Sequence, residues 1–128
     1  MFHWLKDATQ FVRRHRKLLA DRPVWLFSSG PIGTDTVDKE GRDVLELTKP
    51  REFAEFGASI RPRDMRVFFG AFDPEAPPVG IAERMMALTP ARKGMPAGDF
   101  RYWPAIEGWA DSFAGQLASE PRVGATAL

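Results

Sequence analysis

Apolar side chains recur at helical spacing near both ends of the chain. The first stripe faces away from Lys6, Arg13 and Lys17, and it comprises Leu5, Ala8, Phe11, Val12, His15, Leu18 and Leu19. This pattern predicts an amphipathic helix that Asp21 and Pro23 end. The second stripe predicts a closing helix with Pro104 in its first turn, and it comprises Trp103, Ile106, Trp109, Ala110, Phe113 and Leu117.

Two short continuous apolar runs, residues 24–27 and 67–72, are rich in β-forming residues. Such runs are typical of strands buried on both faces, as in parallel sheets. Between them, Thr48 is suited to cap a helix that carries Phe53 and Phe56 inward. The sequence therefore predicts an α/β crossover in which residues 24–27 and 67–71 pair in parallel, with a helix within 48–58.

The remaining segments are less regular. Residues 29–47 are predicted as a long surface loop, Val79 to Leu88 as a further helix, and residues 121–128 as a flexible tail. Nothing divides residues 1–120, which we interpret as one domain. The side chains expected to form its core are Phe27, Phe53, Phe69, Ile106, Trp109 and Phe113.

Composition narrows the classes of function. The 128 residues carry a formal net charge of +1, which argues against a nucleic acid or an anionic membrane as the main partner. The absence of cysteine excludes disulfides, thiolate catalysis and cysteine-ligated metals. No apolar run reaches the ~20 residues that a transmembrane helix needs, and no signal-peptide core follows the first residues. A cytoplasmic location is the expectation.

Four segments, in this order, resemble one family. They are His3-Trp4-Leu5-Lys6 before the first helix, Pro23 to Pro31 around the first strand, Arg66 to Phe72 with its internal glycine, and Gly98-Asp99-Phe100-Arg101 before the closing helix. Together they resemble flavodoxin-like proteins of the menaquinone-dependent protoporphyrinogen dehydrogenase type. The resemblance covers about residues 1–118.

The resemblance implies a three-layer flavodoxin-like fold with a parallel sheet and FMN outside the carboxyl ends of the strands. Residues 24–27 would correspond to the fourth strand and residues 67–72 to the fifth. The chain would then be the C-terminal part of the domain, truncated at its N-terminus and without the family's phosphate-binding loop. The resemblance further implies that FMN binds weakly or not at all to the chain as given.

The same resemblance implies two loops around the flavin ring. The residues concerned are His3, Trp4, Ser28, Ser29, Gly30, Pro31, Ile32 and Gly33. The indole of Trp4 can stack on a flat apolar ring, and the Ser/Gly loop offers amides and hydroxyls to the polar edge of that ring. The alternative is that Trp4 simply begins a core-facing helix and that residues 28–33 are an ordinary turn.

Other motifs carry weaker interpretations. Residues 28–34 lack the Gly-Lys-Ser/Thr ending of a phosphate loop. The basic run of residues 13–17 suits a solvated helix end better than a nucleic-acid patch, and His3 and His15 have no zinc-ligand spacing. Met85, Met86 and Met95 are either core filling or an apolar surface for a quinone or a membrane edge.

The function that follows from the resemblance is FMN-dependent electron transfer with a quinone or a redox protein as partner, although no catalytic acid, base or nucleophile is visible. The alternative is a cofactor-free remnant or protein-interaction module. Two strands are few for a sheet, so the unpaired edge of the first strand is expected to favour a homo-oligomer.

Overall fold

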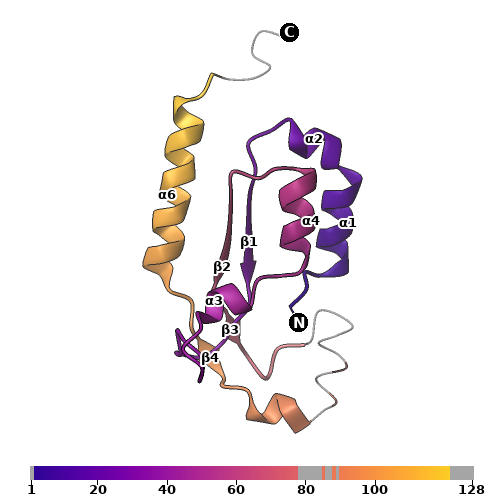
Figure 1. The fold of residues 1–128 in the computed structure, drawn as a ribbon. Helices are drawn as coiled ribbons and strands as arrows, with labels where there is room; N and C mark the ends of the chain where they lie inside the picture. Colours follow the sequence, from indigo (N-terminus) through magenta and orange to yellow (C-terminus); the bar gives the residue numbers. More distant parts are fainter. Residues whose placement is uncertain (1, 78–84, 86–87, 89, 122–128) are drawn as a thin grey trace.

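The computed structural model describes residues 2–77, 85, 88 and 90–121. Within these ranges the chain is a mixed α/β structure around one parallel pair of strands (Figure 1). The elements in chain order are α1 (Lys6–Arg14), α2 (Arg16–Ala20), β1 (Trp25–Ser29), α3 (Val44–Leu47), α4 (Glu52–Ser59), β2 (Asp64–Phe68), β3 (Ala71–Phe72), the 3₁₀ helix η1 (Pro90–Gly94), β4 (Gly98–Asp99) and α6 (Trp103–Ser119).

The parallel pairing predicted from the sequence is confirmed. β1 and β2 run side by side from Trp25 opposite Asp64 to Ser29 opposite Phe68. Their connection contains α3 and α4, so the predicted helix in the crossover is also present. The α/β class therefore holds, with a parallel sheet of two strands in the described part of the chain.

The predicted second strand, residues 67–72, has the wrong bounds. β2 begins earlier, at Asp64, because an edge strand accepts polar residues such as the exposed Arg66 on its solvent side. It ends at Phe68, because the Gly70 amide donates to the Pro31 carbonyl at 2.8 Å and turns the chain toward the loop after β1. Residues 71–72 then pair antiparallel with residues 98–99 as β3 and β4.

The buried core lies on one face of the β1–β2 sheet. Its members are Val12, Leu26, Phe53, Phe56, Ile60 and Val67, contributed by α1, α4 and the inward faces of both strands. Phe56 is fully buried, and the Trp4 ring packs against it at 5.5 Å between ring centroids. These contacts hold α1 and α4 against this face of the sheet, and Figure 1 shows the two helices side by side next to β1.

A second, aromatic layer joins the opposite face of the sheet to α6, which lies on the far side of β2 in Figure 1. Trp109 contacts Phe68 at 5.6 Å and Phe113 at 5.1 Å between ring centroids, and Phe113 contacts Trp25 at 5.1 Å. The indole N–H of Trp109 also donates to Asp64 at 2.9 Å. The helix is thus held both by ring packing and by a hydrogen bond to a carboxylate.

The expected core is only partly correct. Phe53 is buried, whereas Phe69, Ile106, Trp109 and Phe113 are half-buried. The prediction for Phe27 is wrong, because its side chain is 59% exposed. Phe27 touches Trp109 on one side only, since β1 has no strand on its other edge in the described part of the chain.

The N-terminal helix forms as predicted but breaks at His15 into α1 and α2. Its buried face is narrower than the apolar stripe, because Val12 is buried while Leu5, Phe11 and Leu18 are each at least half exposed. An apolar strip along this helix therefore remains at the surface.

One helix was missed in the predicted loop of residues 29–47. The Asp43 carboxylate caps α3 by accepting from the Leu45 amide at 2.8 Å and the Glu46 amide at 3.3 Å. The predicted helix at 79–88 and the tail at 121–128 fall largely outside the described residues. In the ranges that are described, no helix combines the length and apolar character needed to cross a membrane.

Candidate functional site

The loops that follow β1 and β2 lie at the same end of the molecule as the N-terminal segment. The arrow of β1 points toward this end, where the N-terminus, α3, β3 and β4 also lie (Figure 1). Ligands of parallel α/β sheets bind outside the carboxyl ends of the strands. This end is therefore where a ligand site is expected.

A cavity of about 410 Å³ opens at this end. Its volume is within the ~300–1,000 Å³ range of small-molecule sites. The walls are largely apolar, with hydroxyls and one ion pair, and the lining residues are Gly33, Thr34, Thr36, Leu45, Phe68, Phe69, Asp99, Phe100, Arg101, Tyr102 and Ala105. These residues come from the loop after β1 and the helix α3 that follows it, from the end of β2, and from the segment that leads from β4 into α6.

Two glycines allow the chain to follow this wall. Gly33 has φ 105° and Gly98 has φ 146°, conformations that residues with a Cβ rarely adopt. At Gly98 a Cβ atom would also lie 3.3 Å from the Phe100 ring. The glycine thus lets Phe100 fold back toward its own strand, next to the cavity.

An ion pair forms the charged part of the lining. Arg101 donates from Nε to Asp99 Oδ1 at 2.8 Å and from Nη2 to Asp99 Oδ2 at 2.6 Å. These hydrogen bonds, with a further one from the Arg101 amide, lower the pKa of Asp99 to about 2. The guanidinium also lies 5.1 Å from the Trp103 ring centroid. Both charges are balanced within the pair, so the cavity carries little net charge from it.

Of the residues expected to contact a flavin, Gly33 lines this cavity. The loop before it is tied to β2, because the Gly30 amide donates to the Phe68 carbonyl at 3.1 Å. The Gly30 amide is therefore not free to hydrogen-bond a ligand. Pro31 is buried, and Ser28 and Ile32 are half-buried.

His3 and Trp4 are held by α4 instead of by the cavity. The His3 ring nitrogen Nδ1 lies 2.9 Å from Glu52 Oε1, and the Trp4 amide donates to Glu52 Oε2 at 3.2 Å. The Trp4 ring packs edge-on against Phe53 at 5.8 Å. Trp4 is half-buried in these contacts, as the alternative of a core-facing residue at the start of the helix would require.

Glu52 is the carboxylate that orders this N-terminal segment. Burial raises its pKa, but hydrogen bonds from His3 and from the backbone outweigh that effect and hold the pKa below its ordinary value. The Phe2 carbonyl also accepts from the Arg51 amide at 3.0 Å. Residues 2–4 are thus fixed beside the first turn of α4.

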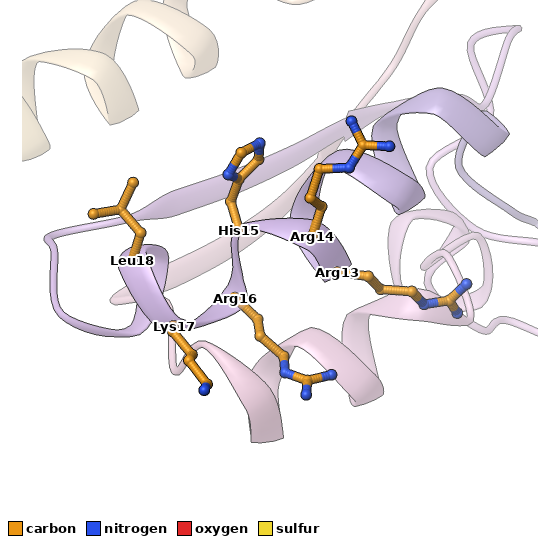
Figure 2. Close-up of a pocket in the computed structure, with 6 residues that line it drawn as sticks. All are labelled: Arg13, Arg14, His15, Arg16, Lys17 and Leu18. Atoms are coloured by element: carbon orange, nitrogen blue, oxygen red, sulfur yellow. The ribbon is translucent and has the colours of Figure 1, made fainter.

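The basic run forms a separate cavity of about 470 Å³ at the break between α1 and α2. Figure 2 shows that Arg14 and His15 extend to one side of the break, whereas Arg16 and Lys17 extend to the other. Arg13 is paired with Glu55 through two hydrogen bonds of 2.7 Å. These positive groups diverge instead of converging on one point, so they do not form a ready anion site.

The sequence interpretation missed Phe100, Arg101 and Tyr102 as lining residues. The signal was a dense aromatic and charged segment immediately before a helix, Gly98 to Trp103. Within the described residues, no group of three or more histidine, aspartate or glutamate side chains is arranged to hold a metal ion.

Comparisons with protein families, with curated proteins and with solved structures found no match for this chain.

Proposed function

We propose that this chain is a flavin-binding module of the flavodoxin type, with the ring of FMN held at the carboxyl end of the β1–β2 sheet for electron transfer. The observation that supports this proposal is the aromatic cavity at that end, bordered by Gly33 of the Ser/Gly loop. The cavity lies where parallel sheets usually bind their ligands, and its aromatic lining suits a flat ring.

The chemistry of the lining residues suits the ring of a flavin. Phe69, Phe100 and Tyr102 offer apolar and aromatic surface for stacking. The hydroxyls of Thr34 and Thr36 are available to hydrogen-bond the polar edge of the ring. A bound flavin would supply the redox chemistry, and these residues would position the ring and limit access of water to it.

The charge of the cavity bears on which part of FMN is recognised. A phosphate is best held by cationic groups or free amides, and charge-assisted bonds of this kind are the strong ones. Arg101 is already engaged by Asp99, and the Gly30 amide by Phe68. We therefore expect the ring to supply most of the affinity, so that riboflavin and FMN bind about equally and with micromolar or weaker dissociation constants.

Quenching of flavin fluorescence tests the proposal. Tyr102→Ala removes a lining aromatic that is 64% exposed, and Phe11→Ala, 59% exposed on α1, is the matched control. Loss of one stacking ring is expected to weaken binding roughly two- to tenfold, the equivalent of about 0.5–1.5 kcal/mol. Equal affinity of the two variants, or no binding of either flavin to the unaltered protein, would contradict the proposal.

A second candidate function is a protein-interaction module. The observation that favours it is the exposed Phe27 beside the edge of β1 that has no strand partner among the described residues. Flavin binding at the carboxyl end and pairing at this edge involve different residues, so they can be tested separately.

A further inference from the structure

Within the described residues, the outer edge of β1 carries backbone groups that no other strand pairs with. In a strand, successive residues direct their backbone groups to alternate edges. The Gly30 amide donates to the Phe68 carbonyl of β2. Ser28 and Leu26 lie two and four positions before Gly30, so their backbone groups also point toward β2. Phe27 and Ser29 therefore direct their N–H and C=O groups to the other edge, which has no strand beside it in the described part of the chain.

This edge is bordered by apolar surface on one face of the sheet. Phe27 lies on the α6 face, where it touches Phe68 and Trp109 at 6.4 and 6.2 Å between ring centroids. It nevertheless remains 59% exposed. An aromatic ring at the centre of a free strand edge is the arrangement that soluble proteins usually avoid, because it invites pairing with another strand.

Apolar side chains are also exposed on the opposite face of the sheet, where α1 and α4 pack. Val12 of α1 packs into the core with Leu26, and Arg13 pairs with Glu55 of α4. Successive helical residues are about 100° apart, so Phe11 lies on the flank of α1 opposite to Arg13 and away from α4. In Figure 1, α1 lies on the β1 side of the strand pair, away from β2. Phe11 is 59% and Leu18 is 52% exposed.

We propose that a second copy of this chain pairs with β1, antiparallel and centred on Phe27, to form a continuous sheet in the order β2-β1-β1-β2. Phe27 is the central residue of the five-residue strand, so a two-fold axis beside it brings the two Phe27 residues opposite each other. The same axis sets Trp25 opposite Ser29 of the other copy. All of these residues face the open edge, so the strand is complementary to itself.

Charge also favours the antiparallel arrangement. α2 directly precedes β1, so the basic residues 13–17 lie toward the amino end of the strand. An antiparallel pair separates the two basic runs, whereas a parallel pair would bring these like charges together. A stable interface buries about 800 Å² per partner, more than one short strand provides. Phe11 and Leu18 on the same flank add to the apolar area that the second copy would cover.

The association is tested by measuring mass against protein concentration by sedimentation equilibrium. The unaltered protein is expected to shift from monomer to dimer as concentration rises. Phe27→Lys places a charge on the paired edge and is expected to raise the dimer dissociation constant at least about tenfold. Leu47→Lys, at a leucine 47% exposed on α3, is the matched control and should leave the association unchanged. Circular dichroism and unfolding curves check that both variants fold.

Amide hydrogen exchange locates the interface. Protection of the Phe27 and Ser29 amides should rise with protein concentration, while the Leu26 and Ser28 amides, which face β2, should be protected at every concentration. A monomer at all concentrations would overturn the proposal. A dimer that Phe27→Lys leaves intact, or that does not protect the Phe27 amide, would overturn it equally.

Discussion

The hydrogen bond between Trp109 and Asp64 offers the clearest test of how α6 is attached. The indole N–H donates to the Asp64 carboxylate at 2.9 Å, and the ring packs against Phe68 and Phe113. Trp109→Phe keeps an aromatic ring in the layer and removes the donor. A hydrogen bond to a charged group contributes about 1.5–3 kcal/mol. The Asp64 side chain is 38% exposed, so solvent screening reduces the expected loss of unfolding free energy to about 1 kcal/mol. The change from an indole to a smaller phenyl ring adds a separate loss of packing.

A double-mutant cycle separates the hydrogen bond from the change in ring size. Urea unfolding of the unaltered protein, Trp109→Phe, Asp64→Ala and the double variant gives the coupling free energy of the pair. We expect a coupling of about 1 kcal/mol, because the residues are in direct contact. Independent effects of the two substitutions would refute the assigned contact.

The same pair predicts a dependence on pH. Burial raises the pKa of Asp64, but hydrogen bonds from Arg66, from Trp109 and from the Met65 amide outweigh it and hold the pKa below its ordinary value. Stability from this carboxylate is therefore complete above its unfolded pKa of about 3.9 and is lost as pH falls through the lower folded pKa. Trp109→Phe removes one of these bonds, so the difference in unfolding free energy between the two proteins should shrink on acidification. A constant difference across that window would contradict the reasoning.

Three further perturbations follow from the described contacts. Phe56→Ala removes a fully buried ring and should cost about 3–5 kcal/mol in chemical unfolding, a larger loss than Phe27→Ala causes in the monomer. Asp43→Ala removes the cap of α3 and should cost about 0.5–2 kcal/mol, whereas an unchanged unfolding midpoint would argue against the cap. Glu52→Gln should flatten the acid limb of the stability curve, because the lowered pKa of Glu52 gives stability that is lost as pH falls; an unaltered limb would count against this role.

The sequence was sufficient for the parallel crossover, because residues 24–27 are a compact apolar run and Phe53 and Phe56 share one face of a helix. It was insufficient for α3, although Asp43 followed three positions later by Glu46 has the spacing of a capping box. Local pattern also misplaced the ends of β2. The end at Phe68 depends on the hydrogen bond from Gly70 to Pro31, a contact between segments far apart in the sequence.

Burial was the least predictable property. Phe27 has the same apolar character as Leu26, yet only Leu26 is buried. Alternate strand residues face different layers, and within the described residues β1 is paired along one edge only. The candidate cavity was equally hidden, since the residues that line it come from three separate segments. Of the residues that were expected from the sequence to contact a flavin, Gly33 lines the cavity.

Chemical-shift mapping shows directly whether a flavin binds in the cavity at the end of the β1–β2 sheet. Amide spectra of the ¹⁵N-labelled protein would be recorded while FMN, and separately riboflavin, is added. We expect both ligands to shift the amides of Gly33, Thr34, Phe100 and Tyr102 and to leave the amides of Arg14 and Arg16 unchanged. No shift at any concentration, or shifts confined to the basic segment of residues 13–17, would show that the cavity at the end of the β1–β2 sheet is not a flavin site.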